Sequence, residues 1–416
     1  MQKQIKLYFF VMVFFAILCL FPYKVYAAVL HFVAYGDTRL SIRSIRKPQI
    51  KHDAIAKVVR KMGPDFILFS GDMIYYNEFE RFLEVITNNY TGERMIPLYP
   101  AIGNHELMFT EKVDTLVRTL LKKIDYKEQV SSSTDTNNDN DNDNDNDNDN
   151  DIRSLWMRLA REIRSIGESE IKERSYQVLQ DELKDKLDPA YVSYLEEVLP
   201  ETNKEQSWYS FIRDVDGLKI KFIVLNSLLP DNKEQFQWFL NELQQFPGPK
   251  IILEHYPPYS IGTHGCRNLR NSESRESRFR DRYARFFNDT SNNIVLIING
   301  HEHNYQRICR VDEAGGVQLP VYIISGGGGA HLEGKGTCDI SQIPLDDFRC
   351  VKFITAYHFL DVMADTDENG TLILNCRVLG LRYDLTKGLP KDEIFVKEFV
   401  KDRLELIDDF TITWQR

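Results

Sequence analysis

Five short polar motifs carry most of the chemically versatile side chains of this 416-residue sequence. Each motif follows an apolar run, and together they supply carboxylate, phenol, amide and imidazole groups. Hard oxygen ligands suit ferric iron and similar cations, whereas imidazole nitrogens suit zinc, iron or manganese. The sequence therefore predicts a two-metal centre formed by Gly36-Asp37-Thr38-Arg39, Gly71-Asp72-Met73-Ile74-Tyr75, Gly103-Asn104-His105-Glu106, Glu254-His255-Tyr256-Pro257 and Gly300-His301-Glu302-His303.

Asp72 is the expected bridging ligand, because a pair of ions needs one carboxylate that binds both. His301 and His303 are alternate residues at the end of an apolar run, so two imidazoles can face one site. A Gly-Asp pair alone would suit an ordinary turn, and two histidines alone could be structural. The conjunction favours a site, since five of the nine histidines lie within or just after the motifs: His105, His255, His264, His301 and His303.

These motifs need a scaffold that brings strand ends together. Apolar, often β-branched runs that mostly stop at glycine, asparagine or proline signals predict buried strands. They span residues 29–35, 65–70, 96–102, 220–226, 250–254, 294–299 and 321–325. Helix-prone stretches at 52–62, 77–87 and 233–245 lie between them. This alternation favours an α/β layered fold, with the site at the strand ends.

The expected core domain spans residues 29–386. Apolar runs at 357–364 and 371–378 flank a turn-rich segment, which predicts a β-hairpin that extends the sheet system. Residues 387–416 are expected to form a C-terminal extension of unknown role.

The core is interrupted at about residues 111–205 by charged, helix-prone sequence, which we interpret as a helical insertion. Its residues 135–151 alternate aspartate and asparagine and cannot bury apolar surface, so this tract is expected to be a disordered loop. Calcium binding is the alternative. An EF-hand loop needs glycine at its sixth position and glutamate at its twelfth, and the tract has neither.

The first 28 residues have the composition of a signal peptide. Lys3 and Lys6 precede an uncharged run, residues 7–21, and Val25-Tyr26-Ala27 provides a cleavage signal. The run is short for a membrane span, which needs roughly 20 apolar residues. We expect an exported protein, periplasmic or extracellular, with no stable span after cleavage; an uncleaved N-terminal membrane anchor is the alternative.

The net charge of −10 argues against a nucleic-acid scaffold role, because phosphate backbones are bound by basic faces. An oxidising compartment would favour disulfides among the five cysteines that follow the signal segment. Cys338 and Cys350 are predicted to pair, since a loop rich in turn residues separates them. The sequence contains no Cys-x-x-Cys spacing, which makes a zinc-thiolate knuckle an unfavoured interpretation. The oligomeric state stays open.

The ordered motif series resembles the calcineurin-type metallophosphoesterases and, within them, the purple acid phosphatases. Most of that superfamily has a histidine two positions after the first aspartate, where this sequence has Arg39; purple acid phosphatases use the tyrosine found here as Tyr75. The segment from His255 to Ile261, followed by His264-Gly265, is similar to one that carries a metal-binding and then a substrate-facing histidine. The resemblance covers most of residues 29–378 and implies a four-layer α/β/β/α sandwich with an inserted helical segment.

Transferred position by position, the resemblance implies two metal ions. The first would be held by Asp37, Asp72, Tyr75 and His303, and the second by Asp72, Asn104, His255 and His301. A tyrosinate ligand favours Fe(III) at the first position, with Fe, Zn or Mn at the second.

The resemblance also implies roles toward substrate. His105 and His264 are the candidate catalytic residues, and the candidate substrate-binding residues are Arg39, Asn104, His105 and His264. Arg39 could hold a phosphate through its planar donor fork or pair with a nearby acid. Glu106 could orient a ligand or act as a base, and the glycine run from Gly326 to Gly329 could approach the site or form a plain turn.

Three functions follow from this interpretation. The first is an exported phosphatase that hydrolyses small phosphomonoesters at acidic pH by attack of a metal-bound hydroxide. The second is a phosphodiesterase acting on nucleotides or phospholipid head groups. The third, disfavoured by the intact ligand set, is a non-catalytic surface protein on the same scaffold.

Overall fold

The computed structural model describes residues 29–39, 49–73, 79–91, 95–107, 207–268, 271–313, 316–339, 347–388, 392–400 and 404–415. The predicted signal segment and the insertion at 111–205 lie outside these ranges, as do Tyr75 and the side chain of Glu106. None of the helices in the described ranges is long and apolar enough to span a membrane.

One sheet of six strands carries the first three motifs. Its order is β13-β12-β11-β1-β2-β3. The strands β1, β2 and β3 are parallel, and the later strands join them antiparallel. The bounds are β1 (Leu30–Tyr35), β2 (Phe66–Phe69), β3 (Leu98–Pro100), β11 (Ala356–Thr366), β12 (Leu372–Arg382) and β13 (Glu405–Trp414).

A second sheet of seven strands carries the last two motifs. Its order is β10-β8-β9-β7-β6-β5-β4, and β5, β6, β7 and β9 form its parallel centre. The bounds are β4 (Tyr209–Val215), β5 (Leu218–Val224), β6 (Lys250–Leu253), β7 (Ile294–Asn299), β8 (Tyr305–Val311), β9 (Val317–Ser325) and β10 (Arg349–Ile354).

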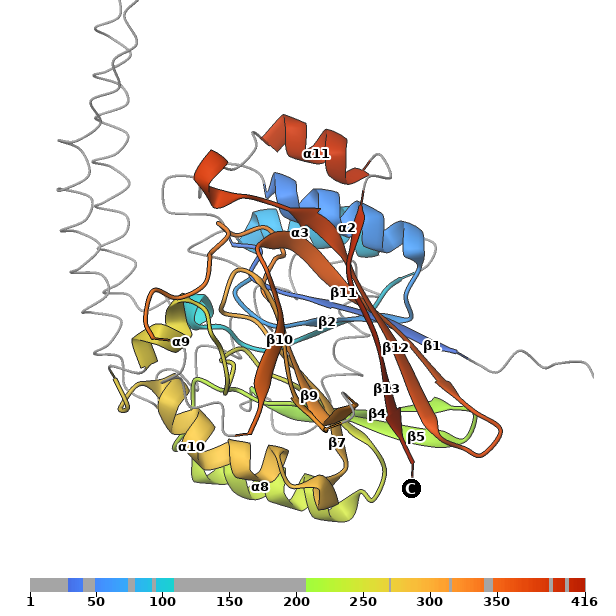
Figure 1. The fold of residues 1–416 in the computed structure, drawn as a ribbon. Helices are drawn as coiled ribbons and strands as arrows, with labels where there is room; N and C mark the ends of the chain where they lie inside the picture. Colours follow the sequence, from blue (N-terminus) through green and yellow to red (C-terminus); the bar gives the residue numbers. More distant parts are fainter. Residues whose placement is uncertain are drawn as a thin grey trace, which may run out of the picture.

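The two sheets pack face to face between two helical layers. Phe32 of β1 meets Phe222 of β5 edge to face, with ring centroids 5.5 Å apart. In Figure 1, α2 (Ile50–Met62), α3 (Phe79–Tyr90) and α11 (Asp392–Val400) lie above the sheets, and α8 (Lys233–Gln245) and α10 (Arg275–Phe287) lie below. Short helical turns complete the chain: η2 (Asn104–Leu107), α9 (Thr263–Asn268), η3 (Thr290–Asn292) and η5 (Leu385–Lys387). The α/β/β/α sandwich expected from the resemblance is confirmed.

Local signals account for several helix ends. The helix α2 ends at Gly63, whose left-handed backbone (φ 65°) lets its N–H donate to the carbonyls of Val59 and Arg60. Asn232 caps α8 by accepting from the N–H of Gln235, and Ser274 caps α10 by accepting from the N–H of Ser277. Such caps satisfy N–H groups that have no partner within the helix.

Within the described residues, every predicted core strand and helix is present, with small shifts at the ends, and β11 and β12 form the predicted hairpin. The C-terminal segment, for which the sequence suggested no role, adds α11 and the edge strand β13; Phe395 and Phe399 of α11 are buried in the main core. The helix α10 was not predicted. Its many arginines make its apolar face hard to recognise in the sequence. That face consists of Phe279, Tyr283 and Phe287, which pack against the seven-stranded sheet.

The predicted disulfide between Cys338 and Cys350 is wrong: Cys338 is bonded to Cys266, 72 residues away in sequence. An isolated antiparallel β-bridge between Gly262 and Lys335 places the loop before Cys338 beside the segment that leads into α9. The helix α9 carries Cys266. Pairing of β10 with β8 meanwhile fixes Cys350, whose thiol donates to the carbonyl of Lys352. Contacts between residues distant in sequence therefore decide which cysteine is bonded to Cys338.

Candidate metal centre

The described motif residues converge where parallel strands of both sheets end. Asp37 follows β1, Asp72 follows β2 and Asn104 opens the turn after β3; His255 follows β6, and His301 follows β7. His303 lies two residues further on. This convergence joins the two sheets at one site, as the strand-end argument predicted.

Asp37 ties the first motif to the last. Its carboxylate is wholly buried and accepts the backbone N–H of His301 through both oxygens, at 3.1 and 3.0 Å. Its Oδ1 also lies 3.6 Å from Nε2 of His303. Both Asp37 and His301 have positive φ, 57° and 72°, a backbone conformation that costs energy and that often occurs at functional sites.

Asp72 lies at the centre of the group. Its Oδ1 accepts the N–H of His105 at 3.0 Å and lies 3.4 Å from Nε2 of His255. Its Oδ2 lies 3.2 Å from Nε of Arg39 and 3.7 Å from Nε2 of His105. This buried carboxylate, also at positive φ (53°), contacts residues of the first, third and fourth motifs.

The orientation of His255 suits a bound cation. Its Nδ1 donates to the carbonyl of Ser70 at 2.8 Å, which leaves a lone pair on Nε2. That lone pair faces two oxygens, Oδ1 of Asn104 at 3.0 Å and Oδ1 of Asp72. With His255 neutral, these three electron-rich atoms repel one another, and a bound cation between them would remove that repulsion.

His303 repeats the arrangement. Its Nδ1 donates to the carbonyl of His331 at 2.6 Å, so its Nε2 lone pair faces Oδ1 of Asp37. Anchoring one ring nitrogen while the other faces the ligand group is typical of metal-binding histidines. One oxygen or nitrogen from each of Asp37, Asp72 and His255 lies within 4.8 Å of the other two, which is close enough for one ion. The donor set fits metal ions.

Burial keeps these imidazoles in the form that binds metal. Removal from water lowers the pKa of His255, and it lowers the pKa of His105, His301 and His303 well below the ordinary value. Arg39 and the neighbouring imidazoles add to the effect at the latter three residues. Neutral imidazole is the metal ligand, so binding requires no proton release from these rings.

The glycines of the motifs are required by close packing. A Cβ on Gly300 would lie 2.5 Å from Oδ2 of Asp37, and one on Gly71 would lie 2.7 Å from the backbone nitrogen of Gly103. The later glycine run approaches the site closely: a Cβ on Gly326 would lie 2.9 Å from the same Asp37 oxygen. Of the two interpretations of that run, close approach is the one found.

Arg39 occupies the edge of the centre. Its Nε contacts Oδ2 of Asp72, and its Nη2 lies 3.5 Å from Nε2 of His303. The guanidinium is therefore paired with an acid, one of the two roles considered for it, and stays within reach of the atoms that would hold the first ion.

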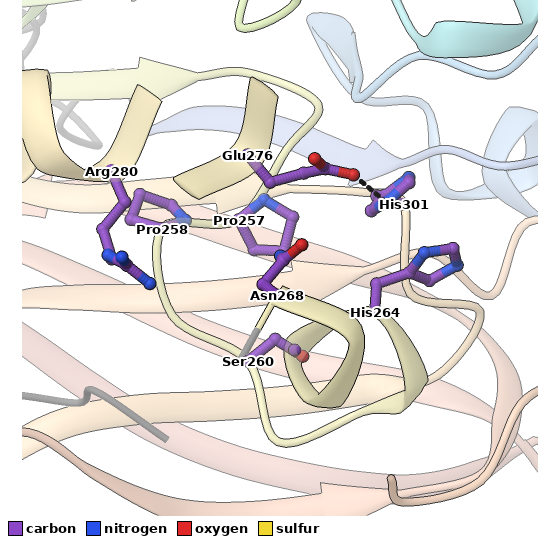
Figure 2. A pocket seen from close by; sticks show the side chains of 9 residues that line it. Pro257, Pro258, Ser260, His264, Asn268, Glu276, Arg280 and His301 are labelled. Atoms are coloured by element: carbon purple, nitrogen blue, oxygen red, sulfur yellow. Dashed lines mark ion pairs between the residues drawn. The ribbon is translucent and has the colours of Figure 1, made fainter. Parts of the chain in front are cut away.

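A small pocket borders the centre on the side of His301 (Figure 2). His264 of α9 lines it, and its ring lies 3.9 Å from the His301 ring. Glu276 of α10 also lines it, with Oε1 3.5 Å from Nε2 of His301. The sequence argument missed Glu276, although Ser274 is a recognisable helix N-cap two residues before it.

The outer side of His264 belongs to a charged network. Nε2 of His264 lies 3.6 Å from Oε2 of Glu333, and Arg267 lies 3.5 Å from Nδ1. Since arginine only donates, Nδ1 is the acceptor and Nε2 carries the hydrogen that faces Glu333. Nothing in the motif pattern pointed to Glu333, which the loop after β9 brings to the site.

Comparison with known proteins gives two structural matches and one family match. The chain resembles a purple acid phosphatase from yellow lupin (Lupinus luteus) seeds, with a TM-score of 0.50 and 16% identity; the match covers 94% of this chain and 55%, about half, of the lupin chain. A match to PhoD has a TM-score of 0.41 and 12% identity, and covers 84% of this chain and 66% of PhoD. No curated protein matches the sequence. The sequence profile of calcineurin-like phosphoesterases matches residues 30–305, more than half of the chain, and the chain therefore belongs to the calcineurin-like phosphoesterase family.

Proposed function

We propose that this protein is an exported dinuclear-metal phosphatase that hydrolyses small phosphomonoesters. The family acts on phosphoesters, and one observation supports the metal-dependent mechanism above the others: the Nε2 lone pairs of His255 and His303 face oxygens of Asp72, Asn104 and Asp37. Such an arrangement is stable when cations occupy it.

The proposed ligand sets are those that the family resemblance implies. Asp37, Asp72 and His303 would hold the first ion together with Tyr75, and Asp72, Asn104, His255 and His301 would hold the second. Fe(III) is proposed at the first position because phenolate suits a strong Lewis acid, with Fe, Zn or Mn at the second. When bound, the two metal ions would supply a hydroxide nucleophile and neutralise charge on the phosphoryl oxygens.

The remaining roles belong to side chains of this chain. Arg39 is proposed to turn its guanidinium from Asp72 to the phosphate. The planar guanidinium offers a pair of donors to the phosphate oxygens. His264 lines the pocket beside the second ligand group and is 17% exposed, so it is accessible to a leaving alcohol and is proposed to protonate it. His105 is held by its N–H on Asp72 and is proposed to stabilise the transition state; His105→Ala should lower turnover while both metals are retained.

Elemental analysis, a visible spectrum and two activity assays test the proposal together. Purified protein should contain two metal ions per chain and hydrolyse a phosphomonoester faster than a phosphodiester; the reverse preference would favour the phosphodiesterase alternative. An absorption band from tyrosinate and Fe(III) should disappear in Tyr75→Phe and persist in a control, Tyr383→Phe, whose ring packs against Tyr357 of β11. Metal-loaded protein inert to both ester classes would refute the enzyme assignment.

A further inference from the structure

Glu302 lies between two predicted ligands, His301 and His303, but has no role in the ligand set. Its side chain is wholly buried. Its Oε1 accepts three hydrogen bonds: from Oγ of Ser260 at 2.6 Å, and from the backbone N–H groups of His264 and Gly265 at 2.9 Å each. All three donors belong to residues 260–265, the segment that leads into α9 and carries His264.

This segment is folded tightly around the carboxylate. A Cβ on Gly262 would lie 2.2 Å from Oε2 of Glu302, and one on Gly265 would lie 2.1 Å from the carbonyl oxygen of Ser260. Gln306 supports the same segment by accepting the N–H of Ile261 at 2.9 Å. Both glycines are therefore required for Glu302 to reach its donors.

The far end of the segment is secured independently. Cys266 is bonded to Cys338, and the N–H of Gly336 donates to the carbonyl of Ile261 at 3.0 Å. Between these anchors, the position of the His264 backbone depends on its hydrogen bond to Glu302. The His264 ring then lies against His301 at the edge of the pocket, where Figure 2 shows it.

We infer that Glu302 is a positioning residue: through the main chain of residues 260–265 it holds His264 beside the metal centre for protonation of the leaving group. The inference rests on the proposed phosphatase function. Glu302, the middle residue of the Gly-His-x-His motif, would then act on residues 260–265, whereas the flanking histidines are predicted metal ligands.

The two oxygens of Glu302 make different contacts, so variants that keep or remove the Oε1 acceptor can be compared. Oε1 makes all three hydrogen bonds, whereas no residue in the described parts of the chain hydrogen-bonds to Oε2. Glu302→Gln keeps an oxygen acceptor of the same reach. Glu302→Ala leaves three donors without their acceptor. Glu302→Asp, which shortens the side chain by one methylene, replaces it in the tests if the alanine variant does not fold.

Kinetics with two phosphomonoesters test the catalytic consequence. Glu302→Ala should lower kcat about 10- to 100-fold for an alkyl phosphate, the range typical of groups that orient catalytic residues. It should lower kcat much less for a nitrophenyl phosphate, whose leaving group needs little protonation. Glu302→Gln should restore most of the activity, and Glu273→Ala, an exposed control, should match the wild type.

A double-mutant cycle separates positioning from general destabilisation. In the His264→Ala background, Glu302→Ala should add no further loss of kcat, because the residue it positions is gone. Additive losses, or loss of metal from Glu302→Ala, would overturn the inference.

Amide hydrogen exchange provides a test that needs no enzymatic activity. The N–H groups of His264 and Gly265 should exchange faster in Glu302→Ala or Glu302→Asp than in the wild type and Glu302→Gln. Unchanged exchange in the shortened variants would contradict the inference even in an active enzyme. Faster exchange in a chain inert to every ester would retain the structural link while refuting the proposed function.

Discussion

The carboxylate of Asp37 accepts the backbone N–H of His301 through both of its oxygens, across 264 positions of sequence. Asp37 follows β1 of the six-stranded sheet, and His301 follows β7 of the seven-stranded sheet. The contact therefore joins the two sheets at the candidate metal centre. Both residues adopt positive φ, so the geometry of the centre depends on packing around it that holds two unfavourable backbone conformations in place.

Close packing at Gly71 predicts a local defect in the centre. Gly71→Ala should lose metal and more folding stability than Gly370→Ala. Both glycines have positive φ, 90° and 75°, which costs alanine about 1–2 kcal/mol at either position. Only at Gly71 would the new Cβ also meet backbone, 2.7 Å from the nitrogen of Gly103, whereas nothing lies within 4 Å at Gly370. Urea unfolding and metal analysis of both variants check this, and equal losses would contradict the packing argument.

The contact between Glu276 and His301 predicts a role in metal affinity. Nε2 of His301 faces Oε1 of Glu276 at 3.5 Å, so Nδ1 is the ring nitrogen that would bind the proposed second ion. Glu276→Ala should therefore weaken binding of that ion about 10- to 100-fold, as loss of a carboxylate that orients a ligand histidine does. Competition with a chromophoric chelator measures the affinity. Glu273→Ala, an exposed change one residue before the Ser274 cap, is the control, and identical affinities in the two variants would exclude this role.

The disulfide between Cys266 and Cys338 predicts a large stability difference. It closes a loop with a sequence separation of 72. In the chain-entropy model, removing such a bridge lowers the free energy of unfolding by about 4 kcal/mol. Cys338→Ser should show this loss in urea unfolding, whereas Cys350→Ser, at a free thiol, should not. A large loss in both variants would instead support the pairing of Cys338 with Cys350.

Two buried histidines outside the predicted ligand set predict acid sensitivity of the fold. Burial lowers the pKa of His52 to about 3 and that of His358 to about 4, from an ordinary value of 6.5. Above the ordinary value both are neutral in folded and unfolded chains and contribute no pH dependence. Below it the unfolded chain binds protons that the folded chain does not, so the free energy of unfolding falls as pH drops toward about 4.

The matched measurement is urea unfolding of chelator-treated protein from neutral to mildly acidic pH. His52→Asn and His358→Asn remove one titrating group each, so each variant should show a shallower fall than the wild type, whatever its stability at neutral pH. Parallel curves would show that these rings do not set the acid limit.

The sequence by itself determined the parts of the molecule that depend on nearby residues. Apolar runs ending in Gly-Asp or Gly-His located the strand ends, because a buried strand and its turn are encoded within a few residues. The spacing of Phe236, Phe239, Leu240 and Leu243 located α8 with its bounds. The types and order of Asp37, Asp72, Asn104, His255, His301 and His303 then indicated metal chemistry.

Only the tertiary structure decided the relationships between distant segments. The bridge from Cys266 to Cys338, the contact of Glu276 with His301 and the hold of Glu302 on residues 260–265 each join segments more than 20 residues apart. No local periodicity encodes such pairs, because they follow from how the two sheets pack and which loops that packing brings together. The sequence therefore predicted the candidate ligands, and the fold decided which other residues lie beside them.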